Sequence, residues 1–236
     1  MPGQLYIVST PIGNLEDITL RALRILKEVD IIAAEDTRHT RQLLSHFEIH
    51  SRRLESCHSF NEHDKVDWLL DEVENGLSLA LVSDAGTPSV ADPGFLLVRS
   101  ALERGLERGL EPVVVPGVSA VTFSVTASGL PVDAFTFRNF APVKPGKRGK
   151  FLESILNDVR TSFFFESPFR IGRTLKEIAA ISPNAKVAVI REATKLHEEI
   201  IRGSAAEVAA LERQWKGEIV VGVYPDKDKD DAGDED

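Results

Sequence analysis

The chain has 236 residues, 42% hydrophobic and 28% charged, which suits one large or two ordinary domains of a soluble globular protein. It contains no run of the ~20 apolar residues that a membrane helix needs, and its first residues lack the basic segment of a signal peptide. A single cysteine, Cys57, excludes an internal disulfide and a zinc site built from several thiolates. We therefore predict a cytoplasmic protein that binds neither a metal nor a membrane.

The net charge of −9 is unevenly distributed along the chain. Residues 226–236 contain seven acidic residues and two lysines, and they account for −5 of this charge. Because this segment has no apolar side chain larger than alanine, we expect a disordered acidic tail. The remaining residues are mildly acidic, which argues against avid non-specific binding of nucleic acid but allows a local basic surface.

Apolar runs alternate with helical patterns through the first half of the chain. A helix is predicted over 20–29, with Asp17 or Thr19 as its N-cap, and another one ends at Gly76. Because the apolar runs are continuous rather than alternating, they indicate parallel strands that are covered on both faces. The predicted strands of this half are 5–9, 31–34, 79–82 and 112–115, with a weaker one at 53–56.

The second half has a different pattern. The two strands on either side of Thr194 and Lys195 follow each other without room for a helix, so this sheet must contain an antiparallel pair. The predicted strands are 135–140, 161–166, 187–191, 197–202 and 218–224, and the predicted helices are 147–159, 168–180 and 204–214.

These patterns predict the α/β class with two domains. Residues 1–116 form an N-terminal domain with a mostly parallel sheet, and residues 117–225 form a C-terminal domain with a mixed sheet. The acidic tail, 226–236, follows them.

The turns at the carboxyl ends of the parallel strands are candidate binding loops, since ligands bind open sheets there. The segment after the first strand places Pro11 and Gly13 before a helix, so that backbone can approach a ligand closely. It has neither the glycine pattern of a dinucleotide site nor the spacing of a P-loop. A plain tight turn is the alternative.

Two acidic residues, Glu35 and Asp36, follow the second strand. Arg38 and Arg41 come next, on one face of a helix. This arrangement suits a ligand that carries both hydrogen-bond donors and negative charge. The alternative is a capped helix with surface ion pairs.

The segment 83–94 after the fourth strand is the strongest of these loops. Its small and acidic residues and its two proline turns leave backbone groups uncovered by bulky side chains. Such a surface fits a flat adenosine or a free amino-acid moiety, with Asp84 placed for an ammonium group. A loop of this length and composition is more than a connector.

Six segments of the chain carry short motifs at the predicted strand ends. They are Thr10-Pro11-Ile12-Gly13-Asn14-Leu15-Glu16-Asp17-Ile18, Ala34-Glu35-Asp36-Thr37-Arg38, Ser83-Asp84-Ala85-Gly86-Thr87-Pro88 with Asp92-Pro93-Gly94, Pro116-Gly117 with Ser119-Ala120, Glu166-Ser167-Pro168 with Arg170, and Arg191-Glu192 with Thr194-Lys195. Each motif is weak alone, but six in register between about residues 5 and 224 are specific. Taken together, they resemble, in order, the signatures of the ribosomal RNA small subunit methyltransferase I family, part of the tetrapyrrole methylase superfamily.

The resemblance implies a two-domain, tetrapyrrole-methylase-like fold that binds S-adenosylmethionine in a cleft between its domains. It also implies methyl transfer to the ribose 2′-hydroxyl of a cytidine in small-subunit ribosomal RNA, and a homodimer. The partners are then ribosomal RNA or the small ribosomal subunit. The cofactor residues it implies are Pro11, Gly13, Asp84, Ala85, Gly86, Thr87, Pro88, Ser119, Ala120, Phe165 and Glu166.

Methyl transfer from a sulfonium is an in-line displacement that needs no metal, and correct alignment of the reactants lowers its barrier. A sugar hydroxyl is a poor nucleophile at neutral pH, so a nearby carboxylate or neutral lysine is expected to accept its proton. A structural or RNA-contacting role is the alternative for each candidate. The candidates, all at predicted strand ends, are Glu35, Asp36, Glu166, Glu192 and Lys195.

A basic run between residues 138 and 150 contains no acidic residue. Because prolines and glycines interrupt it, we predict an exposed, mobile loop that grips phosphates. A solvated loop without a partner is the alternative. The predicted RNA-binding residues are Arg38, Arg41, Lys144, Lys147, Arg148 and Lys150.

Two other functions remain open at this point. The protein is either another methyltransferase of the superfamily, acting on a tetrapyrrole or a protein side chain, or a catalytically silent module that binds the cofactor. The basic run favours an RNA substrate over a tetrapyrrole or a protein side chain. A test for methyl transfer to ribosomal subunits distinguishes the RNA methyltransferase from both alternatives.

Overall fold

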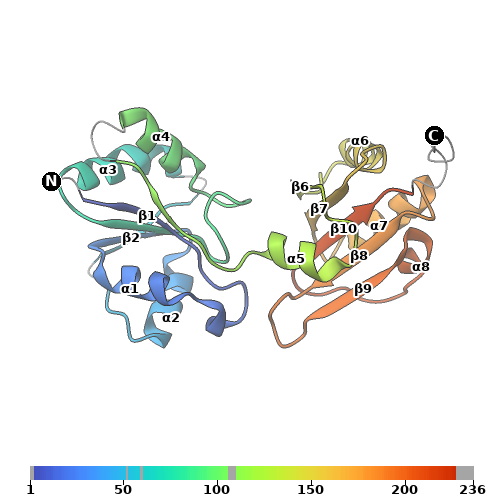
Figure 1. Ribbon diagram of the computed structural model, residues 1–236, viewed down its shortest axis with the longest axis horizontal. Helices are drawn as coiled ribbons and strands as arrows, with labels where there is room; N and C mark the ends of the chain where they lie inside the picture. Colours follow the sequence, from blue (N-terminus) through green and yellow to red (C-terminus); the bar gives the residue numbers. More distant parts are fainter. Residues whose placement is uncertain (1–2, 52, 59–60, 106–109, 227–236) are drawn as a thin grey trace, which may run out of the picture. The chain divides into compact units, whose positions relative to one another are not determined.

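A computed structural model describes residues 3–51, 53–58, 61–105 and 110–226 (Figure 1). The chain divides into two units, Met1–Ser119 and Ala120–Asp236, close to the boundary expected at 116/117. Apart from Asp226, the predicted acidic tail lies outside the described residues.

The first unit is built on a sheet of parallel strands in the order β3-β2-β4-β1-β5. In the centre, Leu5 of β1 lies opposite Leu79 of β4, and the register continues to Val8 and Val82. This confirms the predicted parallel sheet. Its strands are β1 (Leu5–Val8), β2 (Ile31–Ala34), β3 (Arg53–Ser56), β4 (Leu79–Val82) and β5 (Val113–Val115).

Helices cover both faces of this sheet, as its continuous apolar strands require (Figure 1). Leu79 and Leu81 of β4 pack with α3 and α4, whereas Ala80 and Val82 pack with α1 and α2. The helical segments of this unit are η1 (Leu15–Asp17), α1 (Leu20–Glu28), α2 (Thr37–His46), α3 (Glu62–Glu74) and α4 (Phe95–Gly105).

Two predicted helix ends are confirmed. Thr19, one of the two expected N-caps, accepts a hydrogen bond from the Ala22 N–H at 3.1 Å at the start of α1. Gly76, with a φ of 101°, follows the end of α3.

The second unit has a mixed sheet in the order β6-β7-β10-β8-β9. β6 and β7 are parallel, while β10 is antiparallel to β7 and β8, and β8 is antiparallel to β9. This confirms the predicted mixed sheet. Its strands are β6 (Phe135–Phe140), β7 (Thr161–Glu166), β8 (Lys186–Arg191), β9 (Glu199–Ser204) and β10 (Ile219–Tyr224).

The helices of the second unit lie on the two faces of this sheet, with α6, α7 and α8 packed on one face and α5 on the other. The sequence patterns miss α5, because its small and apolar residues show no polar face with helical period. The helices are α5 (Ala120–Ser128), α6 (Pro145–Leu156), α7 (Ile171–Ile181) and α8 (Ala205–Ala209).

Two predictions for the second unit are wrong. Most of the expected mobile loop at 138–150 is regular structure, because β6 continues to Phe140 and α6 begins at Pro145, where proline suits the first turn. The helix expected over 204–214 ends at Ala209, and the chain that follows is irregular up to β10. Among the described residues, no helix is both long and apolar enough to cross a membrane.

Candidate functional site

The parallel strands of the first unit bring four of the predicted binding segments to one edge of the sheet. β1 leads into Ser9, β2 into Glu35, β4 into Ser83 and β5 into Pro116. Ligands of such sheets bind outside the carboxyl ends of the strands. This edge is therefore the candidate site of the unit.

Hydrogen bonds join the loops that follow β1 and β4. Thr10 and Gly86 exchange two backbone hydrogen bonds, with N···O distances of 2.8 and 3.0 Å. The hydroxyls of Ser9 and Thr87 lie 2.8 Å apart, and Thr10 Oγ1 donates to the Ser83 carbonyl at 3.2 Å. The two loops therefore form one preorganised surface of backbone and hydroxyl groups.

Two glycines allow these backbone segments to approach each other. Gly86 has a φ of 81°, and a Cβ added there would lie 3.3 Å from Ile12 Cγ2. At Gly117, which follows β5, a Cβ would lie 2.8 Å from the Cβ of Ser9. A side chain at either position would push the loops apart or strain the backbone.

The predicted cofactor residues of these loops differ in exposure. Pro11 and Pro88 are buried and shape the turns, whereas Gly13 and Ala85 are exposed and Thr87 is half-buried. The edge thus presents small side chains and backbone, which fits a flat, polar ligand better than a bulky apolar one.

A buried carboxylate outside the predicted set anchors the loop 83–94. Glu62 of α3 is 6% exposed and accepts hydrogen bonds from two N–H groups near the start of α4, that of Gly94 at 2.9 Å among them. Ser89 and Ala91 have left-handed φ angles of 73° and 68°, so the conformation of the loop 83–94 is maintained against backbone strain. Glu62 matches a polar position of the family in the sequence, but it was not assigned to the site, since an acid in the first turn of a helix is common for reasons local to that helix.

Glu35 and Asp36 are adjacent in sequence but lie in opposite electrostatic environments. Burial and the negative charge of Asp84 raise the pKa of Glu35 above its usual value. Hydrogen bonds from Arg38 lower the pKa of Asp36, whose carboxylate also caps α2. The Asp36 N–H donates to Asp84 Oδ1 at 2.9 Å, which ties the β2 and β4 loops together. Of the two, Glu35 has the environment of a general base.

The arginines after β2 lie at the surface of α2. Arg38 is paired with Asp36 at 3.1 Å while its side chain remains 85% exposed, and Arg41 is exposed. Both are accessible to a phosphate.

The second unit contributes an aromatic cluster at the end of β7. Phe165 is half-buried, and its ring centroid lies 5.1 Å from those of Phe137 and Phe140. Two other predicted cofactor residues, Ser119 and Ala120, are adjacent in sequence at the division of the chain. Ser119 is the last residue of the first unit, and Ala120 is the first residue of α5.

Glu166 is not available as the general base proposed from the sequence. It is 3% exposed and receives hydrogen bonds from Thr174 Oγ1 at 2.6 Å and from the Ser167 N–H at 2.7 Å. Arg170 pairs with it at 2.7 Å. Both carboxylate oxygens therefore hold the start of α7, and we correct this assignment to a structural one.

Lys195 and Glu192 also need correction as candidate bases. Burial lowers the pKa of Lys195, but its bonds to Glu192 and Glu218, both at 3.1 Å, outweigh this effect, so the pKa is raised. For Glu192, burial raises the pKa, yet hydrogen bonds from the Glu218 N–H and from Lys195 lower it overall. The pair therefore stays charged and locked, instead of supplying a neutral lysine.

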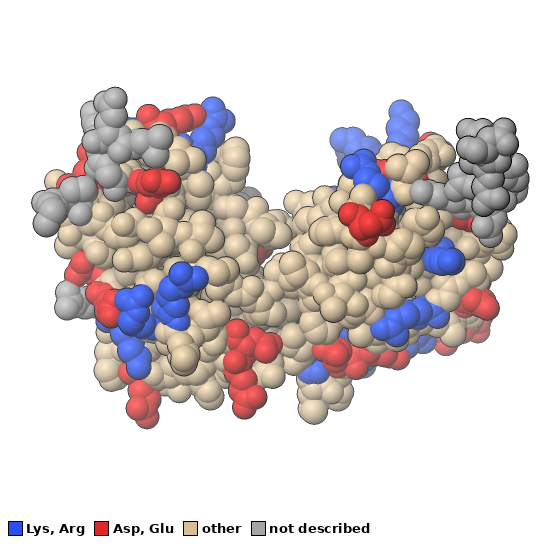
Figure 2. Space-filling view, viewed as in Figure 1, with Lys and Arg blue, Asp and Glu red and all other residues tan. Residues whose placement is uncertain are grey.

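The basic run of the second unit divides into one buried and three exposed side chains. Arg148 is 2% exposed and forms two hydrogen bonds, at 2.7 and 2.8 Å, with Glu177, so it is not a surface phosphate contact. Lys144, Lys147 and Lys150 remain exposed near the start of α6. Basic side chains gather over α6 in Figure 2. We withdraw Arg148 and retain the three lysines.

Within the described part of the chain, no three histidine, cysteine, aspartate or glutamate residues are grouped as a metal ion would need. Cys57 is buried, and burial raises the pKa of its thiol to about 11, which leaves it unreactive at neutral pH.

The chain is similar to a family of methyltransferases along most of its length. Residues 4–209 match the family described as Tetrapyrrole (Corrin/Porphyrin) Methylases. A Xylella fastidiosa protein named ribosomal RNA small subunit methyltransferase I is 46% identical over 236 residues, covering 98% of the chain and 85% of that relative. A protein of the same name from Escherichia coli O157:H7 is 45% identical over 224 residues, covering 93% of the chain and 77% of the relative.

Solved structures share the fold at much lower sequence identity. The crystal structure of the methyltransferase CobJ matches with a TM-score of 0.69 and 20% identity, covering 94% of both chains. At this identity the likeness concerns the fold alone, and it agrees with the two sheets described above.

Proposed function

Because the chain belongs to the tetrapyrrole methylase family and, within it, to the ribosomal RNA small subunit methyltransferase I group, we propose that it methylates the ribose 2′-oxygen of a cytidine in small-subunit ribosomal RNA. The observation that carries this proposal is the similarity, over nearly the whole chain, to relatives named for ribosomal RNA methylation. The cytidine and its 2′-oxygen come from the resemblance of the six sequence motifs. The reaction would take place in the cytoplasm.

Methyltransferases of this family use S-adenosylmethionine, and the carboxyl edge of the first unit fits this molecule. The loops there combine the closely approached backbone of Gly86 with the hydroxyls of Ser9 and Thr87. The carboxylate of Asp84 is chemically suited to the ammonium group of a free amino acid. When bound, the cofactor supplies an electrophilic methyl group on a sulfonium.

The residues of this chain then have three tasks. The loops after β1, β4 and β5 hold the cofactor, with Pro11, Gly13, residues 84–88 and Ser119 as proposed contacts. Ala120 and Phe165 are the proposed contacts from the second unit. Glu35 accepts the proton of the ribose hydroxyl, because its raised pKa makes it a better proton acceptor than an ordinary carboxylate. The RNA phosphates contact exposed basic side chains, namely Arg38, Arg41, Lys144, Lys147 and Lys150.

The test uses methyl-labelled S-adenosylmethionine and small ribosomal subunits from a strain that lacks the gene. After nuclease digestion, we expect label in 2′-O-methylcytidine at a single position. Label on a base or another sugar would contradict the proposed reaction. Cofactor binding by calorimetry without transfer to any RNA would favour a silent binding module, and transfer to a tetrapyrrole or a protein side chain would favour another methyltransferase of the superfamily.

We also propose that the protein is a homodimer, from an apolar stripe on α4. Phe95 and Leu102 are 61% and 47% exposed, and with Val98 they line a shallow groove. Arg99 and Glu103 flank the stripe, 2.6 Å apart. In a two-fold dimer, these opposite charges can exchange partners between the two copies, which makes the surface self-complementary. Sedimentation of the Phe95→Asp variant tests this: a monomer is expected, and an unchanged dimer would remove α4 from the interface.

A further inference from the structure

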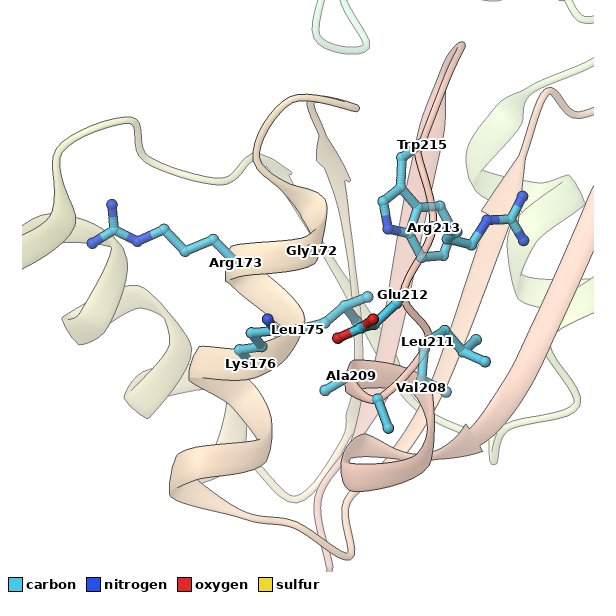
Figure 3. A pocket seen from close by; sticks show the side chains of 11 residues that line it. Gly172, Arg173, Leu175, Lys176, Val208, Ala209, Leu211, Glu212, Arg213 and Trp215 are labelled. Atoms are coloured by element: carbon cyan, nitrogen blue, oxygen red, sulfur yellow. The ribbon is translucent and has the colours of Figure 1, made fainter.

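A cavity of about 380 Å³ lies entirely within the second unit (Figure 3). One wall comes from α7 around Gly172 and Lys176, and the other from the end of α8 and the irregular segment that reaches Trp215. This volume is in the range that accommodates a small ligand or one nucleotide. None of the site residues assigned above lines it.

The cavity is preorganised by contacts around Trp215. The guanidinium of Arg213 lies 4.7 Å from the centroid of the indole and is itself held by Glu199 through two contacts of 2.8 Å. A Cβ added at Gly172 would lie 3.8 Å from the indole nitrogen, an ordinary van der Waals distance, so α7 packs close to the edge of the indole. The indole is thus fixed in place before any ligand arrives.

The cavity contains a carboxylate together with this aromatic ring. Figure 3 shows the Glu212 carboxylate in the space between α7 and α8, while Arg173 and Arg213 extend away on opposite sides. Among the described residues, neither Glu212 nor Lys176 has an ion-pair partner. A flat ligand with N–H donors on its edge matches the indole and the carboxylate at once.

The rim of the cavity is positively charged, although the whole chain has a net charge of −9. Glu177 forms two hydrogen bonds with Arg148, which neutralise its charge. Arg173 also lies 3.0 Å from Glu177, and its side chain is 65% exposed. This group of one acid and two arginines therefore has a net positive charge. Lys176 lies one turn further along α7. Together these groups favour a ligand whose other end carries a phosphate.

We propose that this cavity binds one nucleobase of an RNA strand, stacked on Trp215, with the adjoining phosphate at Lys176. Guanine fits best, because its N1–H and N2–H₂ groups can both donate to the Glu212 carboxylate, whereas uracil presents two carbonyl oxygens and a single N–H. The inference rests on the proposed function in taking RNA as the partner. It adds an RNA-anchoring site away from the reacting carboxyl edge of the first unit.

The test measures binding of two seven-nucleotide RNAs that differ only in one central guanosine or uridine, by fluorescence anisotropy at fixed salt. Trp215→Leu keeps an apolar side chain but removes the stacking surface, and we expect about tenfold weaker binding of the guanosine RNA. Glu212→Gln should abolish the preference for guanosine, and Lys176→Ala should weaken both RNAs equally and reduce the salt dependence.

Matched controls change the same charges elsewhere on the surface. Glu111→Gln and Lys27→Ala remove one exposed carboxylate and one exposed lysine from the first unit and should leave both affinities unchanged. Cofactor binding and thermal unfolding of every variant are measured in parallel, so that a folding defect is recognised.

The outcomes separate this inference from the proposed function. If the wild-type protein methylates ribosomal subunits but Trp215→Leu and Glu212→Gln bind both RNAs as the wild type does, the nucleobase site is overturned and the proposed function stands. If no RNA is ever methylated, yet the guanosine preference and its loss in Glu212→Gln are observed, the site stands and the proposed function fails. Binding of a lysine-rich peptide, without binding of either RNA, would also overturn the nucleobase site.

Discussion

The strand ends of the two units use charged residues in different ways. At the carboxyl edge of the first unit, backbone and small hydroxyl side chains form the surface, and Glu35 has a raised pKa. At the corresponding ends of the second unit, Glu166 and Lys195 are each held by two or more partners. The charged groups at the strand ends of the second unit are therefore bound to partners within the fold, whereas we propose a chemical role for Glu35 in the first unit, since a charge that is fully paired has little left to offer a substrate.

The largest expected effect concerns catalysis at Glu35. Glu35→Gln should lower kcat about 10²- to 10⁴-fold with little change in cofactor affinity or unfolding temperature, because only proton acceptance is lost. Labelled methyl transfer to ribosomal subunits measures it, with Asp36→Asn as the neighbouring control. An Asp36→Asn defect larger than that of Glu35→Gln would reverse the roles assigned to these two carboxylates.

The second prediction concerns stability at Glu166. Glu166→Ala should reduce the free energy of unfolding by about 3 kcal/mol, because Arg170 and Thr174 lose their buried acceptor. Chemical denaturation measures this loss, and Glu153→Ala, an exposed change on α6, should cost far less. A stable Glu166→Ala protein that binds cofactor but has lost turnover would return Glu166 to the list of catalytic candidates.

A smaller effect, on cofactor affinity, is expected when a side chain is added at Gly86. Gly86→Ala must place a side chain at a φ of 81° and within 3.3 Å of Ile12, so we expect about tenfold weaker cofactor binding by calorimetry. The control is Gly146→Ala at the start of α6, where an added Cβ has no neighbour within 4 Å among the described residues. Equal cofactor affinity in both variants would show that the Gly86 loop does not carry the site.

The smallest expected effect is a shift in pH dependence. The proposed role of Glu35 as the proton acceptor requires its deprotonated form, so we expect activity to fall as the pH drops through the raised pKa of this group. Asp84→Asn removes a negative charge that contributes to this shift, and the acidic limb of kcat at saturating cofactor should then move to lower pH. An acidic limb that stays in place would mean that a group other than Glu35 controls the rate.

Much of the fold was predictable from local patterns. The strands β2 and β4 have the predicted bounds, because continuous apolar runs between turn residues specify buried parallel strands. The weaker pattern at β3 also has the predicted bounds. The α5 helix was not predictable, since its residues pack on the second sheet without a periodic polar pattern. The early end of α8 at Ala209 was not predictable either. Helical periodicity requires a polar face, which α5 lacks.

For the candidate site, the sequence determined which residue types stand at the strand ends, and hence the family and the chemistry to expect. Only the tertiary structure decided which of them are available. Lys147 is exposed while Arg148, its neighbour, is buried against Glu177, and Glu62 reaches across to the loop of another helix. The physical reason is that exposure, ion pairing and pKa depend on partners distant in sequence, which a local pattern does not contain.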